Sequence, residues 1–323
     1  MLEHTAEEIL RLEDVVVDFH LHKGILTAVN SVSFALHRRE AMGIVGESGC
    51  GKSVTAMSIM GLNPSPPAQT RGRIIFEGEN LLTKTPKEMR EVRGDQIGMI
   101  FQEPMTSLNP VFTVGDQIIM GIQSHREISA REARDLAIDM LAKVGIPGPS
   151  ERINNYPHEF SGGMRQRVML ALALVLSPTL LIADEPTTAL DVSVQAQILN
   201  LLDDLISTMG MSLIFISHDL NVVADICDRI GVMYMANLVE VAGTDDIFDS
   251  PLHPYTRGLM ECSPVIGHKV PRLESIRGAI GNMLQPPGGC RFHPRCPEMK
   301  PICTRETPLL KEIAPGHFVA CHL

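Results

Sequence analysis

One short glycine-rich segment constrains the fold of this 323-residue chain more than any other feature. Residues 46–53 read GESGCGKS and fit the pattern G-x-x-x-x-G-K-[ST]. They follow a buried apolar run at 41–45 and precede a helix-like run at 54–60. Glycines let such a loop curl so that its backbone N–H groups point at phosphate oxygens, and the following helix dipole favours the anion. The sequence therefore predicts a phosphate-binding loop, called the phosphate loop below.

The residue types within the phosphate loop predict how it would hold a nucleotide. Lys52 would reach the β- and γ-phosphates, and the Ser53 hydroxyl would ligate Mg²⁺. We expect nucleotide contacts from the whole loop and from the residue that follows it, that is, from Gly46, Glu47, Ser48, Gly49, Cys50, Gly51, Lys52, Ser53 and Val54.

An apolar run at 180–185 supplies the acidic partner that such a loop needs. The run reads LLIADE, so two carboxylates follow a predicted buried strand. Asp184 would hold Mg²⁺ through water, and Glu185 is placed to take a proton from the attacking water. An apolar run ending in two acids is a weak signal alone, but it becomes strong beside the phosphate loop.

Composition limits the partners and the compartment. The chain has 28 basic and 38 acidic residues, a formal charge of −10, and only 4% aromatic residues. This balance argues against a nucleic-acid binder that works by a basic footprint and base stacking. Three glutamates within the first eleven residues argue against a secretory signal, so we expect a cytoplasmic protein. The longest apolar run, 168–183, is too short to span a bilayer and is interrupted at Pro178, which predicts a buried helix and then a strand.

Hydrophobic periodicity predicts an α/β fold. Strand signals occupy 9–19, 29–36, 41–45, 72–78, 97–101, 180–183, 213–217 and 230–234, and helical spacing occupies 114–144 and 192–209. Short apolar strands alternating with helices favour a mostly parallel sheet covered on both faces. The mid-chain helices, about 104–175, look like an insertion into a core at 1–250. Residues 251–323 are rich in proline and cysteine, which predicts an irregular C-terminal appendage.

A second motif gives the chain a family resemblance. Residues 160–167 read FSGGMRQR, which resembles the signature sequence of ATP-binding cassette (ABC) ATPases. Without the resemblance, Ser-Gly-Gly is an ordinary helix cap and turn. The resemblance implies that Ser161, Gly162 and Gly163 face the γ-phosphate of a nucleotide held by the opposite subunit. ATP hydrolysis would then require a dimer, and the fold would be an ABC nucleotide-binding domain.

The same resemblance assigns roles at other positions. Gln102 matches the glutamine that senses Mg²⁺ and the γ-phosphate, and His218 matches the histidine that contacts the γ-phosphate. Asp191 closes the segment TALD at 188–191, which matches the loop that crosses the dimer interface. Phe19 lies at about the position of the aromatic ring that stacks on adenine. Two neighbours could replace Phe19 in that role, His20 and His22.

Within the family, the segments QEPMTSLNP at 102–110 and HPYT at 253–256 resemble the oligopeptide/dipeptide importers. The resemblance implies ATP hydrolysis that powers import, chiefly of peptides, with nickel or oligosaccharides as other cargoes. Its partners would be a second ATPase subunit, in a heterodimer rather than a homodimer, two transmembrane permeases and an extracytoplasmic solute-binding protein. The chain would sit on the cytoplasmic face of the membrane, where the loop around 102–110 and the helical insertion would receive the permease.

Two other functions fit the sequence less well. A non-transport ABC ATPase acting on the ribosome or on nucleic acid usually has two cassettes or a long insertion, and this chain has one phosphate loop. A regulatory module that binds ATP without hydrolysing it is disfavoured because the residues for hydrolysis are all present, namely Lys52, Asp184, Glu185 and His218.

Four cysteines gather near the C-terminus, at Cys290, Cys296, Cys303 and Cys321. They contain no C-x-x-C pair, the usual spacing of structural zinc sites, and disulfides are not expected in a reducing cytoplasm. Thiolates that converge in a segment with little core suggest a fold held by a metal. The resemblance implies a [4Fe–4S] cluster, which takes all-cysteine ligation. The alternatives are free thiols or zinc with nearby histidines, namely His293, His317 or His322.

Overall fold

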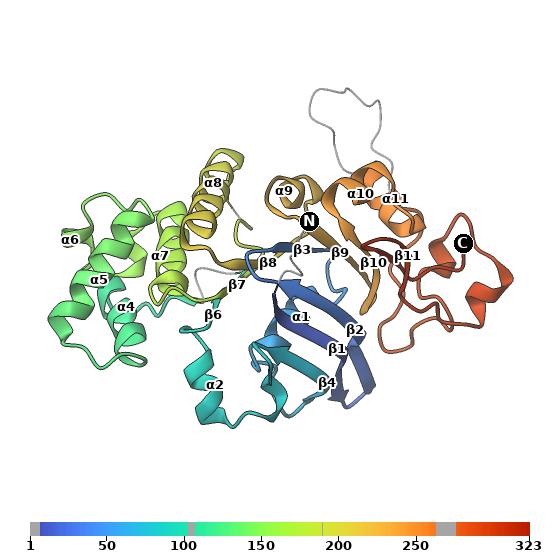
Figure 1. Cartoon of the computed structure of the whole chain (residues 1–323), viewed down its shortest axis with the longest axis horizontal. Helices are drawn as coiled ribbons and strands as arrows, with labels where there is room; N and C mark the ends of the chain where they lie inside the picture. Colours follow the sequence, from blue (N-terminus) through green and yellow to red (C-terminus); the bar gives the residue numbers. More distant parts are fainter. Residues whose placement is uncertain (1–6, 103–106, 189, 263–275) are drawn as a thin grey trace. The chain divides into compact units, whose positions relative to one another are not determined.

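The computed structural model describes residues 7–102, 107–188, 190–262 and 276–323 (Figure 1). The chain divides into two compact units. Unit 1 comprises residues 1–83 and 215–323, and unit 2 comprises residues 84–214. Unit 2 is thus inserted in the sequence of unit 1. Several positions of the predicted segments 102–110 and 188–191 lie outside the described residues, namely Glu103, Pro104, Met105, Thr106 and Ala189.

Unit 1 opens with an antiparallel sheet, seen in blue shades in Figure 1. Its central strand β1 (Glu8–Leu21) pairs with β2 (Gly24–His37) and β4 (Ala68–Phe76), and β4 pairs with the short β5 (Glu79–Asn80). The strands predicted at 9–19 and 29–36 are confirmed. The strand predicted at 72–78 begins earlier, because residues from Ala68 onward already pair with the end of β1.

A second sheet of unit 1 carries the phosphate loop. Strand β3 (Ala41–Val45) is fully buried and runs parallel to β9 (Arg229–Tyr234). Burial of every residue is expected of a strand that is covered on both faces. Strand β10 (Asn237–Gly243) pairs antiparallel with β9, β12 (His317–Val319) pairs with β10, and β11 (Lys311–Ala314) pairs with β12.

The C-terminal region is more regular than the sequence predicts. It contains the helix α11 (Pro254–Cys262), the strands β11 and β12, and two 3₁₀ helices, η3 (His293–Arg295) and η4 (Pro301–Thr304). Strands form here despite the many prolines because Pro315 falls in the turn between β11 and β12, outside the hydrogen-bonded ladder. Residues 251–323 belong to the same compact unit as the phosphate loop. The remaining helical elements of unit 1 are α1 (Lys52–Ile59), η1 (Leu81–Thr83), α9 (Leu220–Ile226) and α10 (Thr244–Asp249).

Unit 2 combines a pair of parallel strands with a group of helices. Strands β6 (Ile97–Ile100) and β7 (Leu180–Asp184) lie at the apolar runs predicted as strands, and they pair in parallel. The helices of the insertion contact one another and form the green cluster of Figure 1, namely α4 (Val114–Gln123), α5 (Ala130–Lys143), α6 (Pro149–Arg152) and α7 (Gly162–Leu174). Unit 2 also contains α2 (Pro86–Val92), η2 (Pro157–Glu159) and α8 (Val192–Met209), and β8 (Ser212–Ser217) spans the boundary of the two units.

Local capping explains where the helices of unit 2 begin. The continuous helical signal at 114–144 is divided in two, because Ser129 caps α5 through a reciprocal capping box with Glu132. Thr113 caps α4 in the same way. The apolar run 168–183 is split between α7 and β7, as Pro178 predicts. Within the described parts of the chain, no helix has both the length and the hydrophobicity needed to cross a bilayer.

Candidate functional site

The phosphate loop joins β3 to α1 in a conformation that only glycine adopts easily. Gly46 and Gly51 have φ angles of 149° and 110°. A Cβ atom on Gly46 would lie 2.1 Å from the carbonyl oxygen of Met233, and one on Gly51 would lie 2.3 Å from that of Ala28. The two glycines therefore allow the loop to pack directly against neighbouring backbone. The loop enters helix α1 with its backbone N–H groups at the helix N-terminus, the arrangement that binds phosphate.

The side chain of Lys52 is buried within the phosphate loop. Lys52 is only 4% exposed, and its Nζ donates hydrogen bonds to the carbonyls of Gly46 (2.7 Å) and Glu47 (3.2 Å). Ser48 and Gly49 are exposed, so the crest of the loop is open to solvent. Burial raises the pKa of the Cys50 thiol, which keeps that side chain neutral beside Lys52. A single ammonium group is thus fixed beneath an open, backbone-lined loop.

The predicted adenine contact and the predicted histidine lie in unit 1 with the phosphate loop. Phe19 is half-buried on β1, opposite Leu26 of β2 and Ala68 of β4. His20 is exposed, and its Nε2 lies 3.3 Å from Oε1 of Gln69. His218 is exposed directly after β8. The roles of these side chains remain predictions.

In unit 2, the end of β7 brings two of the predicted catalytic residues together. Asp184 is the buried last residue of β7, and Glu185 follows it with a φ of 46°. A positive φ at a non-glycine residue is uncommon and is found at functional sites. Glu185 Oε2 accepts hydrogen bonds from Gln102 Nε2 (3.0 Å) and from Thr188 Oγ1 (2.9 Å). Gln102 follows β6, so the parallel pairing of β6 and β7 brings its side chain to Glu185.

The signature segment forms the start of helix α7, also in unit 2. Ser161 is the N-cap and accepts a hydrogen bond from the Met164 N–H at 3.4 Å. Gly162 and Gly163 occupy the first turn, where backbone N–H groups have no partner within the helix. Asp191 caps α8 in the same manner, with Oδ1 accepting from Val194 N–H at 2.9 Å. Two capped helix starts therefore lie in the unit that carries Glu185.

One contact in this region was missed by sequence reasoning. The buried side chain of Gln166, on the second turn of α7, donates a hydrogen bond to the Pro186 carbonyl. Gln166 lies within the signature segment, and this position in the motif could have indicated that its side chain makes a functional contact. The contact ties the signature helix to the loop that carries Glu185.

The structure brings the four C-terminal cysteines near one another. The Cys290 N–H donates to the Cys303 carbonyl at 2.8 Å. Burial, with smaller contributions from the other three cysteines, raises the pKa of the Cys290 thiol to about 11. All four are free thiols. Over residues 7–102, 107–188, 190–262 and 276–323, however, no three His, Cys, Asp or Glu side chains are arranged to hold a metal ion.

The histidines of the zinc alternative have other partners. His317 Nε2 lies 2.7 Å from Glu240 Oε1 in a buried pair. His293 Nδ1 lies 2.9 Å from the Cys290 carbonyl, and His322 Nε2 lies 2.9 Å from the Glu306 carbonyl. Each of these contacts uses one ring nitrogen, and such a bond to a carbonyl or carboxylate is the usual second contact of a metal-binding histidine.

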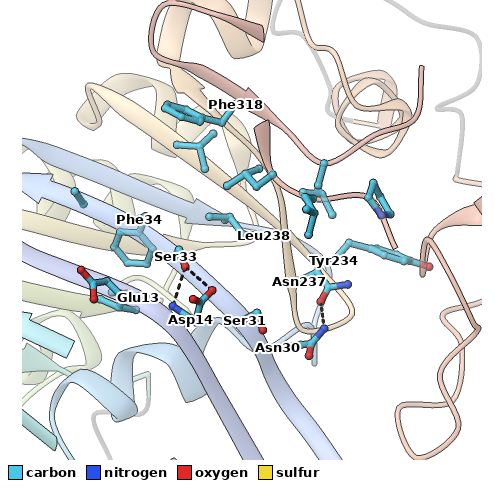
Figure 2. A pocket seen from close by; sticks show the side chains of 18 of the residues that line it. Glu13, Asp14, Asn30, Ser31, Ser33, Phe34, Tyr234, Asn237, Leu238 and Phe318 are labelled. Atoms are coloured by element: carbon cyan, nitrogen blue, oxygen red, sulfur yellow. Dashed lines mark hydrogen bonds between the residues drawn. The ribbon is translucent and has the colours of Figure 1, made fainter. Parts of the chain in front are cut away.

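A cavity of about 1020 Å³ within unit 1 lies apart from the predicted site (Figure 2). Its lining comes from β1, β2, β9, β10 and the C-terminal region, and includes no residue of the phosphate loop. Four of its labelled polar residues form two hydrogen-bonded pairs: Asn30 donates to Asn237 at 2.7 Å, and the Asp14 N–H donates to Ser33 Oγ at 2.8 Å. The cavity is separate from the phosphate loop.

Comparison with known proteins agrees with the motifs. The family profile described as ABC transporter matches residues 29–188, and the profile described as oligopeptide/dipeptide transporter, C-terminal region, matches residues 239–303. A probable peptide ABC transporter ATP-binding protein of Sinorhizobium fredii is 50% identical over 98% of this chain and 95% of its own length. The dipeptide transport ATP-binding protein of Bacillus subtilis is 47% identical over the same shares.

Solved structures show the same fold. A dimeric ATP-binding cassette in a post-hydrolysis state, bound to ADP and phosphate, superposes with a TM-score of 0.66 at 26% identity. The match covers 73% of this chain and 99% of that one. The relatives match nearly the whole chain, and the two profiles match its ATPase part and its C-terminal part. The chain belongs to the ABC transporter family of ATPases and carries the C-terminal region found in oligopeptide/dipeptide transporters.

Proposed function

We propose that this ABC ATPase hydrolyses Mg·ATP to power the import of di- or oligopeptides. The observation that carries the proposal is the pairing of a complete phosphate loop with the transporter-type C-terminal region in one chain. The relatives named for peptide, dipeptide and oligopeptide transport, at 44–50% identity over nearly the whole chain, support the cargo.

In this proposal the phosphate loop and the acidic loop after β7 divide the chemistry. The backbone of residues 46–54, with Lys52, would hold the phosphates, and Ser53, Gln102 and Asp184 would surround Mg²⁺. Glu185 would take the proton of the attacking water as general base. The hydrogen bond from Gln102 to Glu185 supports this role, because a donor on Oε2 orients the carboxylate before water arrives.

The remaining site residues would complete the ATP sites of a dimer. Ser161, Gly162 and Gly163 would bind the γ-phosphate of a nucleotide held by a second ATPase subunit, with Asp191 at the interface. The N–H groups of Gly162 and Gly163, which lie in the first turn of α7 and have no partner within the helix, support the anion site. His218 would contact the γ-phosphate in its own subunit, and Phe19 would stack on adenine. The dimeric ATP-binding cassette that this fold matches supports the assembly. We expect a heterodimer rather than a homodimer.

The partners follow from the transporter role. Two transmembrane permeases would bind the ATPase dimer on the cytoplasmic face of the membrane, and an extracytoplasmic solute-binding protein would deliver the cargo. We propose that residues 1–250 form the nucleotide-binding domain, with a helical subdomain at about 104–175, and that residues 251–323 form the transporter-type extension.

For the extension, we propose a [4Fe–4S] cluster held by Cys290, Cys296, Cys303 and Cys321. The all-thiol donor set and the proximity of Cys290 to the other three cysteines support it. Because burial favours the neutral thiols, metal binding must release protons and should weaken at low pH. Anaerobically purified protein should contain iron and acid-labile sulfide in equal amounts. Stoichiometric zinc without iron would contradict the cluster.

A reconstitution experiment tests the function. The chain, its partner ATPase, both permeases and the binding protein are placed in proteoliposomes, and uptake of a labelled dipeptide is measured with ATP hydrolysis. We expect both to rise when dipeptide is added and to require ATP. If nickel or an oligosaccharide stimulated ATP hydrolysis and peptide did not, the proposed peptide cargo would be wrong. Recovery of the native protein with ribosomes rather than membranes would contradict the transport role.

A further inference from the structure

Every polar atom of Glu47, the second residue of the phosphate loop, is engaged. Its N–H donates to Tyr255 Oη at 2.9 Å, and its carbonyl accepts from Lys52 Nζ at 3.2 Å. Its carboxylate accepts two hydrogen bonds from Arg295, from Nη1 to Oε2 at 2.7 Å and from Nη2 to Oε1 at 3.1 Å. Tyr255 and Arg295 both belong to the C-terminal region, so this region is bonded directly to the phosphate loop.

The pair between Arg295 and Glu47 differs from an ordinary surface ion pair. The Arg295 side chain is 4% exposed and that of Glu47 is 26% exposed. Arg295 is also fixed independently of Glu47, because Nε donates to the Arg277 carbonyl at 3.1 Å and the guanidinium lies 5.7 Å from the centre of the Tyr234 ring. A bidentate ion pair between ordered side chains is stronger and more directional than an ion pair on the exposed surface.

An aromatic cluster holds both partners of Glu47 in place. Tyr234, Tyr255 and Phe292 are almost completely buried, with ring centres between 4.6 and 5.4 Å apart. Phe292 is the residue immediately before η3, and η3 ends with Arg295. The cluster therefore fixes the Tyr255 hydroxyl and the helical turn that presents the guanidinium.

A second connection from the C-terminal region reaches the phosphate loop at Cys50. Arg291 donates to the Met235 carbonyl, and the next residue, Ala236, donates its N–H to the Cys50 carbonyl at 2.8 Å. Cys50 is the fifth residue of the loop pattern. Two separate arginines of the C-terminal region thus support the phosphate loop.

The position of Glu47 affects Lys52 directly, because the carbonyl of Glu47 is one of the two that hold Nζ. We propose that Arg295 is a positioning residue for nucleotide binding, which fixes Glu47 so that the phosphate loop and Lys52 are ordered before ATP arrives. This inference rests on the proposed nucleotide site at residues 46–53. Ordering a loop in its bound conformation raises affinity without adding a contact to the ligand. Arg295 should therefore affect ATP affinity more than the rate of hydrolysis at saturation.

The test measures equilibrium binding of Mg·ATP to the full chain by calorimetry, with thermal melting as the check on folding. Arg295→Ala should raise the Kd about tenfold, within the range of residues that act through another residue. Arg295→Lys should fall between the wild type and Arg295→Ala, because an ammonium group keeps the charge but lacks the planar pair of donors that matches the carboxylate. Unchanged affinity in folded Arg295→Ala protein would overturn the proposal.

The matched control is Arg229→Ala. Arg229 pairs with Glu40 at 2.9 Å, and both side chains are largely buried. Glu40 precedes β3, whereas Glu47 follows it, so this pair lies at the opposite end of the strand from the phosphate loop. Loss of this pair should lower the melting temperature but leave the Kd unchanged. An equal rise in Kd for Arg229→Ala would show a general loss of stability and contradict a specific role for Arg295.

A double-mutant cycle tests whether Arg295 acts through Glu47. Glu47→Ala should weaken ATP binding about as much as Arg295→Ala, and the double variant should be no weaker than either, because both remove one interaction. Additive losses would contradict this route. If Arg295→Ala does not fold, Glu47→Gln takes its place and must also raise the Kd. Failure of the wild-type chain to bind Mg·ATP would instead refute the proposed nucleotide site.

Discussion

The phosphate loop and the acidic loop after β7 are built in contrasting ways. Residues far away in the sequence fix the phosphate loop: Gly51 packs on the backbone of Ala28, and Glu47 is bonded to Tyr255 and Arg295. The acidic loop combines a local bond, from Thr188 to Glu185, with bonds from Gln102 to Glu185 and from Gln166 to the Pro186 carbonyl. Both loops therefore depend on tertiary contacts, but the phosphate loop is held by an ion pair and the acidic loop by neutral donors.

The two loops also differ in the strength of their contacts. Lys52 is buried and bonded to two carbonyls, and the ion pair at Glu47 is charge-assisted. Glu185 is half-buried and is held by two neutral donors, one of them the exposed Gln102. A single hydrogen bond from a neutral donor is weaker and less directional than the bidentate pair between Glu47 and Arg295. Substitutions around the phosphate loop should therefore change ATP affinity, and substitutions in the acidic loop should change turnover.

The largest effect is expected from Glu185→Gln. Loss of a general base lowers the rate of proton transfer by about 10²- to 10⁴-fold, and the amide keeps an oxygen that Gln102 and Thr188 can reach. Turnover in the assembled transporter should fall by this factor while the Kd for Mg·ATP stays unchanged. Steady-state hydrolysis and calorimetry measure the two quantities. Glu127→Gln, at an exposed position of the same unit, is the control and should behave as wild type.

The next largest effect is expected from Lys52→Ala. Removing a buried ammonium from the phosphate site should raise the Kd for Mg·ATP by about 10- to 100-fold, the equivalent of a charged hydrogen bond. Lys143→Ala, on the exposed end of α5, should bind ATP normally. Binding by Lys52→Ala that equals the control would mean that the loop backbone alone determines affinity.

Acid should weaken unit 1 through His253. Burial lowers the pKa of His253 to about 3, and Tyr255 N–H donates to its Nδ1, so the folded state requires the neutral ring. Because the unfolded pKa is about 6.5, this stability is complete above that pH and is lost as the pH falls toward 3. The free energy of unfolding should drop by roughly 1.4 kcal/mol per pH unit below 6.5.

Denaturant titrations between pH 7 and 5 measure this slope. His253→Asn keeps an acceptor for the Tyr255 N–H but does not titrate, so its slope should be smaller than that of the wild type. Equal slopes would show that other groups dominate the acid response. ATP affinity should fall together with stability, because Tyr255 bonds the phosphate loop.

The smallest effect is expected from Thr188→Val, which removes one hydrogen bond from Glu185. The free energy of unfolding should change by no more than about 0.5 kcal/mol, as is usual for a contact outside the core. Turnover should fall a few-fold, because Glu185 would lose one of the hydrogen bonds that orient its carboxylate. Thr188→Ser retains the hydroxyl and should restore turnover. A loss of ATP affinity in Thr188→Val would contradict the expectation that the acidic loop affects turnover and not binding.

Local patterns in the sequence predict the elements on which both loops stand. The phosphate loop, its preceding strand β3 and the long helix α8 lie where the motif and the periodicity place them. These features depend on residues close together in the chain, whose turn preferences and hydrophobic spacing are readable directly. The contact between Gln102 and Glu185 was not predicted: both residues follow predicted strands, but only the parallel pairing of those strands brings the side chains together.

Long-range contacts are what the sequence could not reveal. Arg295 and Glu47 are separated by 248 positions, and no local rule indicates that a charge in a proline-rich segment meets a glycine-rich loop. The pairing of β12 with β10 is also a contact between distant parts of the sequence. In addition, a three-residue strand such as β12 carries little periodic signal. Both contacts arise from tertiary packing, which propensity does not determine.

One experiment tests the division between affinity and turnover most directly. Mg·ATP is titrated into transporters assembled with Arg295→Ala or Glu185→Gln, and hydrolysis is followed from low ATP to saturation. Arg295→Ala should need about tenfold more ATP but reach nearly the wild-type maximal rate. Glu185→Gln should bind ATP normally and remain inactive at saturation. A lowered maximal rate with unchanged ATP requirement in Arg295→Ala, or wild-type hydrolysis by Glu185→Gln, would contradict the account.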